Sequence, residues 1–339
     1  MVVAGRATNG WHGWSTTAQQ LRPRRSSIAT VNDTSDRLVI GVASSALFDL
    51  RKPDAVFLEE GPQAYHKYQD EHLDDPLPAG VALPFISRML KLNSLDPSRV
   101  DDPLVDVIVM SRNSAVTGLR IMRSVEHYGL PVIRAVFTSG VAPFAYCPAF
   151  GVSLFLSWDE ASVRAAIQAG VPAGQVLASA HADDAEDEGV RIAFDFDGVL
   201  ADDEAEEAFA AGGIAGFQHH EAQRLSVPHN PGPLQGFLTG VAALQRKERE
   251  VLGGPGRLRV AVITARSVPA HERAINTLRT WGVEVDDMFF LAGADKGNVV
   301  EVLRPHIYFD DQTSHLTSTR RFAPSVHVPF GMRNAATVE

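Results

Sequence analysis

The chain has 339 residues, of which 45% are hydrophobic and 21% charged, and its formal net charge is −10 at neutral pH. This length suffices for two domains of ordinary size, and this composition is typical of a globular protein with a sizeable core. The acidic balance argues against a nucleic-acid partner, because binding a polyanion needs a basic surface that displaces counterions.

Cysteine content and hydropathy set two further limits. Cys147 is the single cysteine of the chain, so an internal disulfide is excluded and a reducing compartment is favoured. We expect its side chain in the core. The sequence contains no apolar run of about 18 residues, the length that a transmembrane helix needs. We therefore expect no membrane partner and a cytoplasmic location.

Residues 1–36 differ from the rest in composition. They contain Arg, Ser and Thr but no acidic residue before Asp33. We predict a disordered extension here. A misassigned start and an organellar transit peptide, which has this composition, are the alternatives.

The first half of the chain resembles the second. The resemblance joins 37–50 to 190–203, 106–115 to 259–268, and 135–160 to 288–312. It matches Ser44 with Asp195, Ser111 with Thr264, and Asp159 with Asp310. Because each copy is domain-sized, the repeat predicts two Rossmann-like α/β units, residues 37–180 and 190–331. Generic α/β patterning in both halves is the alternative.

Residues 181–189, HADDAEDEG, lie between these units. A charged run that ends in Gly between two apolar strand patterns is typical of a solvated, flexible linker. Its acids are consecutive and lack the spacing of a calcium loop, which argues against a cation site.

Residues 191–200, RIAFDFDGVL, combine an apolar strand with two aspartates at its end, Asp195 and Asp197. Buried parallel strands are near-continuous apolar runs, and ligands bind at their carboxyl ends. Two carboxylates crowded there are costly unless a cation or a catalytic task keeps them. A strand end followed by an Asx turn is the alternative.

Residues 203–257 form a longer connection than a simple βα unit needs. Acids at the start and a Gly pair at the end predict a helix over 202–213. Pro and Gly content predicts a loop over 217–236, and apolar spacing predicts a second helix over 237–252. The apolar face of that helix is expected to hold Phe237, Val241, Leu244 and Val251.

Two later strands also end in polar side chains. Residues 258–266, LRVAVITAR, place Thr264 at a strand end, where a hydroxyl can bind phosphate. Residues 306–312, HIYFDDQ, place Asp310 and Asp311 at another. Between them lies Lys296, one of only five lysines in the chain.

This order of groups suits phosphoryl transfer. Asp195 can attack phosphorus to form an aspartyl-phosphate, and Asp197 can protonate the leaving oxygen and then activate water. Lys296 offers a compact positive charge to the phosphate. Mg²⁺ would bridge carboxylate and phosphate oxygens, with Asp310 and Asp311 completing its site.

The first unit lacks this chemistry. Ser44 and Ala46 stand in the places of Asp195 and Asp197, and Pro143 or Phe144 in the place of Lys296. Asp159 and Glu160 remain, but an acidic pair without its partners is more typical of a helix cap. We predict that residues 37–180 are catalytically degenerate and support the active unit, contribute to its pocket or mediate assembly.

The ordered set of two aspartates, a threonine, a lysine and an acidic pair resembles the haloacid dehalogenase superfamily of phosphatases. Longer stretches resemble the cytosolic 5'-nucleotidase type I family: FDLRKPDAVF, PGPLQGFLTGVAALQRK, VITARS, TLRTWGVEVDDMFFLAGADKG and RPHIYFDDQ. The resemblance extends from about residue 38 to residue 331. Phe196 departs from it, since animal members have Gly there, but we expect this side chain to point away from the site.

The resemblance implies Mg²⁺-dependent hydrolysis of nucleoside 5'-monophosphates, notably AMP, by a homo-oligomer. It implies a small cap at about 203–257, inserted in the second unit and covering the site. The metal would be held by Asp195, the backbone carbonyl of Asp197, and Asp310 or Asp311. Thr264 and Lys296 would contact the phosphate.

Recognition of the nucleoside is the least determined part of the site. Candidate contacts to base or ribose are Phe217, His220, Asn230 and Gln235, and Arg266 is a candidate contact to phosphate or ribose. Loop packing is the alternative for the first four, and a surface ion pair for Arg266.

Two rival functions follow from the same residues. A phosphatase of the same superfamily that acts on sugar phosphates would keep every catalytic group and differ in its cap. A non-catalytic nucleotide-binding or regulatory protein would not need a nucleophile and an adjacent acid, which argues against it.

Overall fold

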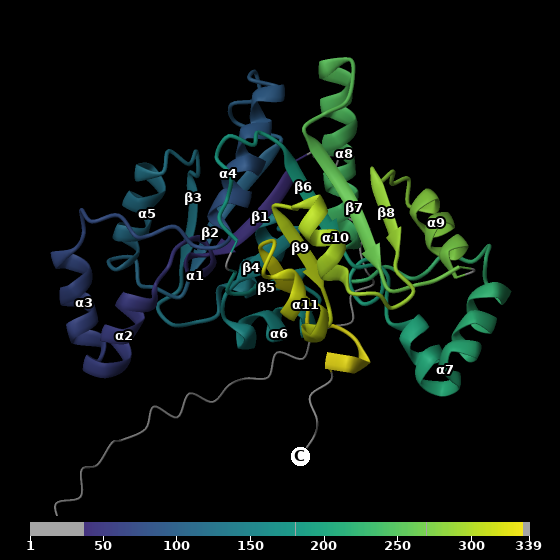
Figure 1. Cartoon of the computed structure of the whole chain (residues 1–339). Coiled ribbons are helices and arrows are strands. Elements are labelled where there is room, and N and C mark those ends of the chain that lie inside the picture. Colours follow the sequence, from purple (N-terminus) through teal and green to yellow (C-terminus); the bar gives the residue numbers. More distant parts are fainter. Residues whose placement is uncertain (1–36, 180, 269, 335–339) are drawn as a thin grey trace, which may run out of the picture. The chain divides into compact units, whose positions relative to one another are not determined.

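The described strands form one ten-stranded, mostly parallel sheet in the order β3-β2-β1-β4-β5-β10-β9-β6-β7-β8 (Figure 1). The computed structural model describes residues 37–179, 181–268 and 270–334, and our prediction for residues 1–36 lies outside them. The α/β class expected from the sequence is confirmed.

The elements alternate along the chain as α/β folds do. The first half supplies β1 (Leu38–Ala43), α1 (Ser44–Leu47), α2 (Arg51–Glu60), α3 (Pro62–Glu71), α4 (Leu83–Lys91), η1 (Leu92–Leu95), β2 (Val105–Ser111), α5 (Gly118–His127), β3 (Arg134–Phe137), η2 (Pro143–Tyr146), η3 (Pro148–Phe150), β4 (Leu154–Ser157), α6 (Glu160–Gln168) and β5 (Ala173–Val176). The second half supplies β6 (Val190–Phe194), α7 (Glu204–Gln223), α8 (Gln235–Leu252), β7 (Leu258–Thr264), α9 (His271–Thr280), β8 (Asp287–Phe290), α10 (Lys296–Leu303), β9 (Ile307–Asp310), α11 (Thr313–Thr319), β10 (Ser325–His327) and η4 (Met332–Asn334).

The two halves of the sheet have the same strand order. β1 lies between β2 and β4, and β6 lies between β7 and β9. Neighbours within each half are parallel, and the halves meet through the antiparallel strands β5 and β10. The carboxyl ends of the strands in one half therefore lie at the opposite edge of the sheet from those of the other half.

Strand register corrects the alignment that we drew between the halves. Ile40 and Ile192 are equivalent, because each pairs with the corresponding two neighbours of its own half. Counting from them, the counterpart of Asp195 is Ala43, one residue before Ser44. The conclusion about chemistry is unaffected, since neither residue is a carboxylate.

The predicted match of Asp159 with Asp310 also changes, by two residues. Asp310 pairs with the β10 residue His327, and the equivalent pairing in the first half joins Ser157 to β5. Ser157, rather than Asp159, is therefore the counterpart of Asp310. Asp159 is the N-cap of α6, where its carboxylate accepts a hydrogen bond from the backbone N–H of Ser162 at 3.3 Å. The expected cap is confirmed.

Two loops repeat in backbone detail. Ser139 after β3 and Ala292 after β8 both take left-handed conformations, with φ of 49° and 50°, and each is followed by a Gly with positive φ. Each donates its N–H to the loop that follows the preceding strand, Ser139 to Asn113 and Ala292 to Arg266. Such strain in non-Gly residues persists only where surrounding contacts determine it. In the second half this loop leads to Lys296.

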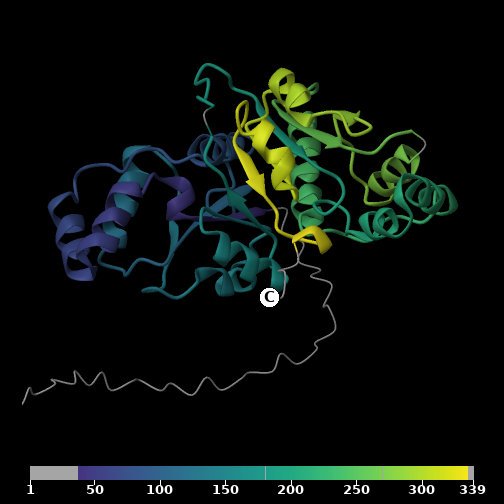
Figure 2. The same ribbon diagram turned by 60° about the horizontal axis from the view of Figure 1, so that its bottom comes forward.

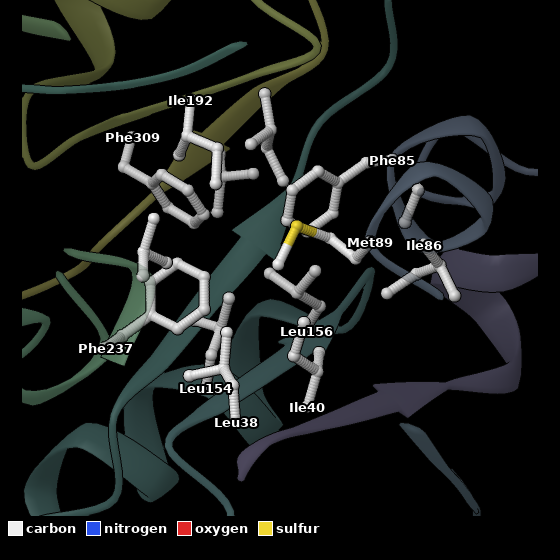
Figure 3. Close-up of a cluster of buried hydrophobic side chains, with 14 of the residues drawn as sticks. Leu38, Ile40, Phe85, Ile86, Met89, Leu154, Leu156, Ile192, Phe237 and Phe309 are labelled. Atoms are coloured by element: carbon white, nitrogen blue, oxygen red, sulfur yellow. The ribbon is translucent and has the colours of Figure 1, made fainter. Parts of the chain in front are cut away.

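One hydrophobic cluster extends across both halves (Figure 3). It includes Leu38 and Ile40 from β1 and Ile192 from β6, which alternate with residues facing the other side of the sheet. Helix α8 contacts both β1 and β7, and α4 contacts both β2 and β6. The halves therefore share a core on this face, whereas the opposite face carries two separate clusters.

The predicted second helix of the insertion is α8. Phe237, Val241 and Leu244 are buried, as its apolar spacing indicated. Val251 is half exposed, so that part of the prediction was wrong. It lies in the last turn, just before Gly253 ends the helix in a left-handed conformation.

The first helix of the insertion is longer than predicted. Gly213 has φ of 60° and ψ of −158°, so the Gly pair bends α7, but helical structure then continues to Gln223. The predicted loop over 217–236 therefore starts as a helix, and only its residues 224–234 are irregular, because α8 begins at Gln235. Helices α7 and α9 lie on the same side of the molecule in both views (Figures 1 and 2), and Arg273 of α9 pairs with Glu204 and Glu221 of α7.

The acidic linker, residues 181–189, is mostly exposed, as predicted, but contacts with α4 hold it in place. The buried guanidinium of Arg88 on α4 pairs with Asp183 at 2.9 Å and donates to the carbonyls of Asp184 at 2.7 Å and Gly189 at 3.2 Å. The charges of residues 181–189 alone do not predict this contact, because Arg88 lies 95 residues before Asp183 in the sequence.

Candidate active site

The carboxyl ends of three neighbouring strands bring the predicted catalytic residues together. Asp195 directly follows β6, Thr264 ends β7 and Asp310 ends β9. Lys296 begins α10, which Asp295 caps. All four of these site side chains are buried, so their charges and hydroxyl are held in a medium that screens them weakly.

Lys296 lies between two carboxylates. Its Nζ is 2.6 Å from Oδ2 of Asp195 and 2.8 Å from Oδ2 of Asp310. Burial by itself would lower the pKa of Lys296, but these two carboxylates raise it to about 12. The ammonium is therefore retained at every physiological pH.

The carboxylate of Asp310 is fully engaged. Burial opposes its charge, yet Lys296 and His315 hold the pKa of Asp310 well below its usual range. The Tyr308 hydroxyl also donates to it, and Nδ1 of His315 lies 3.2 Å from each of its oxygens. The backbone N–H of Gln312 donates to Oδ1 at 2.8 Å. Asp310 is thus a fixed anion that holds Lys296.

The pKa of Asp195 is shifted in the opposite direction from that of Asp310. Burial raises its pKa and the nearby Asp310 adds to that rise, while Lys296 opposes it, and the result is about 7. Its Oδ1 accepts the backbone N–H of Phe196 at 2.7 Å. Phe196 itself is buried in the core cluster and is not among the residues that line the cavity over the site.

Asp311 carries a buried oxygen without a partner. Its Oδ1 has no hydrogen-bond donor, although the side chain is only 2% exposed. Gly198 leaves room for it, because a Cβ on Gly198 would lie 2.8 Å from Cγ of Asp311. Burial, and then the charges of Asp195 and Asp310, raise the pKa of Asp311 to about 9. Such a group is a candidate metal ligand.

These acids could hold a divalent cation. Donor atoms of Asp195, Asp310 and His315 lie within 4.8 Å of one another, and the free oxygen of Asp311 supplies the hard donor that such ions prefer. Both oxygens of Asp310 already accept hydrogen bonds, whereas Oδ1 of Asp311 accepts none, so we regard Asp195 and Asp311 as the candidate ligand pair. The residues present therefore fit a metal ion.

A second group of possible ligands, Asp202, Glu204 and His229, lies nearby. Glu204 pairs there with Arg273 at 2.8 Å and also with Arg224. Two guanidinium groups disfavour a cation at this place, and we interpret the group as part of an ion-pair network.

A cavity of about 440 Å³ opens over the site, within the range of small-molecule pockets. Asp195, Asp197 and Thr264 line its floor. Apolar side chains of α7 line one wall, among them Phe209 and Ile214, which are otherwise exposed. The cavity thus joins a polar, charged end to an apolar surface.

The predicted nucleoside contacts are only partly brought together here. Phe217 lines the cavity. His220 instead contacts Arg224 at 2.9 Å, Asn230 donates to Asp202 at 2.8 Å, and Gln235 donates to Thr239 at 3.1 Å. These three are not among the cavity's lining residues.

Arg266 lines the cavity but is not at the surface. Its side chain is 3% exposed and forms a bidentate ion pair with Asp197, with Nη2 2.6 Å from Oδ1 and Nε 2.8 Å from Oδ2. Arg266 therefore forms an ion pair, as the alternative prediction stated, but this ion pair is buried and does not lie at the surface.

Several residues of the site escaped the sequence analysis. Tyr308 had a signal, since it precedes Asp310 by two residues on a strand and must face the same side. His315 lies one helical turn beyond the acidic pair. Glu206 and Gln312, also at the cavity, gave no comparable sign.

The chain is also similar in sequence to known proteins. A sequence model of the 5'-nucleotidase family matches residues 30–335. The chain belongs to the 5'-nucleotidase family. Human cytosolic 5'-nucleotidase 1B is 34% identical over 292 residues, which cover 84% of this chain and 47% of the human protein. The resemblance to the 5'-nucleotidase family is thus confirmed.

Two facts qualify the match to this nucleotidase family. The chain spans about half the length of the human relative, and no solved structure matches it significantly. Among the described helices, none combines the length and apolar character needed to cross a bilayer.

Proposed function

We propose that the chain is a phosphoric monoester hydrolase that removes phosphate from nucleoside 5'-monophosphates, AMP foremost, with Mg²⁺ as cofactor. The observation that carries the proposal is the placement of Asp195. It is a buried carboxylate at a strand end, beside a lysine at 2.6 Å and on the floor of a nucleotide-sized cavity. Family membership supports the same chemistry.

We assign the proposed Mg²⁺ to Asp195, Asp311 and the backbone carbonyl of Asp197. Asp310 would act through Lys296, to which it is bonded. Bound there, the ion would draw negative charge from the phosphate and the carboxylates. The unpartnered oxygen of Asp311 and the close approach of Gly198 support this assignment.

In the proposed reaction, a carboxylate oxygen of Asp195 attacks phosphorus and the bond to the nucleoside 5'-oxygen breaks. Asp197 gives its proton to that oxygen, so the nucleoside leaves as an alcohol. Asp197 then takes a proton from water, which attacks phosphorus and returns Asp195 as a carboxylate. Lys296 and Thr264 would hold the phosphate in place.

The wall formed by α7 would recognise the nucleoside. Phe209, Ile214 and Phe217 present apolar surface beside the charged floor, which suits a flat base attached to a phosphate. Glu206 of the same helix binds Arg333 at 2.7 Å and Gln312 at 3.1 Å, so polar groups for base or ribose also lie at this rim.

The wider organisation is proposed on the same basis. Residues 203–257, with α7 and α8, would act as a small cap of a haloacid dehalogenase-type unit. The first half would be its degenerate counterpart, supported by the matching strand order and the absence of carboxylates at Ala43 and Ser45. A cytoplasmic homo-oligomer without nucleic-acid or membrane partners remains our expectation.

The test is phosphate release from a panel of nucleoside 5'-monophosphates and sugar phosphates, with Mg²⁺ and with chelator. We expect release from AMP or its relatives that stops on chelation, since the four aspartates of the site outnumber its two buried cations, Lys296 and Arg266. Preference for sugar phosphates would instead favour the rival phosphatase. Nucleotide binding without Mg²⁺-dependent release would favour a regulatory protein.

Replacing Asp311 by Asn is expected to weaken Mg²⁺ binding while stabilising the metal-free protein. The pKa of Asp311 rises on folding from 3.8 to about 9, so its contribution to stability is full at low pH and is lost as pH rises through that interval. Asn removes this loss. We expect a melting temperature higher by a few degrees at pH 8 without metal, and a half-saturating Mg²⁺ concentration at least about tenfold higher.

The pH dependence serves as the internal control for this variant. Metal-free wild type should lose stability between pH 6 and pH 8 partly through Asp311, and the Asn variant should lose less. Unchanged Mg²⁺ affinity in a folded variant would remove Asp311 from the ligand set.

A further inference from the structure

Arg266 is the most heavily constrained side chain next to the proposed chemistry. Beyond its two bonds to Asp197, it is paired with the buried Glu221 on α7 and donates to the carbonyl of Ala270 at 3.2 Å. The rings of Phe196 and Phe217 lie on its guanidinium, with centroids 5.1 and 5.4 Å from Cζ. Nε2 of His229 also lies 3.1 Å from Nη2 of Arg266, so six neighbours fix one buried cation.

Glu221 connects this arginine to both ends of α7. Its other oxygen accepts Nη1 of Arg273 at 2.8 Å, and Nη2 of Arg273 binds Glu204 at 2.8 Å. Glu204 begins α7 and Glu221 lies in its last turn. Opposite charges thus alternate without a break from Asp197 to the first turn of the helix.

We propose that Arg266 is a positioning residue that orients Asp197 for proton transfer, with Glu221 holding Arg266 in place from α7. The inference rests on the proposed function, since it gives Asp197 the role of acid and base there. It makes α7 both a wall of the substrate cavity and the support of the proton-transfer group.

The geometry explains how the orientation is set. A guanidinium fork matches both oxygens of a carboxylate, which fixes the plane of the carboxylate as well as its position. Each oxygen keeps a second lone-pair position, which can carry the proton given to the substrate oxygen or accept a proton from water. An ammonium at the same place would keep the charge but lose the fork, so Lys is the informative replacement.

The experiment compares two substrates in single-turnover reactions with Mg²⁺. Release of adenosine from AMP needs proton donation to a poor leaving group, whereas p-nitrophenol leaves p-nitrophenyl phosphate as an anion. We expect Arg266→Lys to slow the first reaction about 100-fold, the usual effect of a small misplacement, and the second only a few-fold. The ratio of the two rates is the readout.

Arg273→Lys is the matched control. Arg273 is equally buried and also binds Glu221, but it has no contact with Asp197. It should disturb the same network and leave the ratio of the two rates as in wild type. In an Asp197→Asn background, Arg266→Lys should add no more than about a twofold loss with AMP, because both changes act on one group.

Glu221→Gln keeps the proposal testable if Arg266→Lys does not fold. The amide retains the shape but not the charge, and we expect a loss of about tenfold with AMP and little with p-nitrophenyl phosphate. Equal losses on both substrates, or full additivity with Asp197→Asn, would overturn the inference. If wild type releases no phosphate from any nucleotide, the proposed function fails instead.

Discussion

Asp195→Asn is expected to abolish turnover, lowering phosphate release from nucleoside monophosphates by about 10⁴-fold or more, because a covalent nucleophile has no substitute in the site. The amide has nearly the same shape, so the cavity is preserved. It removes a carboxylate whose pKa burial has raised to about 7, and with it the atom that attacks phosphorus. Release of phosphate from AMP with Mg²⁺ measures the effect.

Asp159→Asn is the control for this substitution. Asp159 also follows a strand of the sheet and begins a helix, where Asn caps as well as Asp. It lies in the half without the catalytic groups and should keep wild-type activity. An Asp195→Asn protein with near-normal turnover would remove Asp195 from the mechanism as the nucleophile and favour direct attack by water.

The strand ends could be predicted because the sequence determines them locally. Each of these strands is a run of apolar residues, and Asp195, Thr264 or Asp310 stands at its end. This pattern predicts both the strand and the edge of the sheet at which the polar group lies. Parallel pairing then gathers these groups without further information. Lys296 was found for another reason, its rarity in an arginine-rich chain.

What lies across the site from those strands was not predictable in the same way. Glu221 appeared to belong to a polar loop, and only tertiary contacts with Arg266 and Arg273 make it a buried helical residue. Polarity predicts exposure unless a partner of opposite charge is known. The partners here are about 45 to 52 positions away, beyond the reach of local patterns.

The repeat shows the same limit at a larger scale. Similar segments identified the two halves, but similarity between short apolar segments does not fix the match to a single residue, and it paired Ser44 instead of Ala43 with Asp195. Register follows from hydrogen bonding between strands, which a single sequence does not contain. The register also puts Ala46 at the position where Gly198 makes room for Asp311 in the second half.

Lys296→Met is expected to lower turnover about 10³-fold, close to the cost of losing a principal electrostatic group in phosphoryl transfer. Met fills similar space without charge. In the wild type the Lys296 ammonium lies 2.6 Å from Asp195 and 2.8 Å from Asp310. Without it, these two buried carboxylates have no cation between them. The phosphate loses a cation and the nucleophile loses the partner that keeps it ionised.

The pH profile separates this electrostatic role of Lys296 from a structural one. Lys296 lowers the pKa of Asp195, so in Lys296→Met that pKa rises above about 7 and less of the carboxylate is ionised at neutral pH. The loss of activity should therefore shrink as pH is raised from 7 to 9, while Lys91→Met, on an exposed lysine, should follow wild type throughout. If the folded Lys296→Met protein loses the same fraction of activity at every pH, Lys296 acts on the phosphate alone and not on the ionisation of Asp195. Asp310 would then serve to position Lys296 for the phosphate.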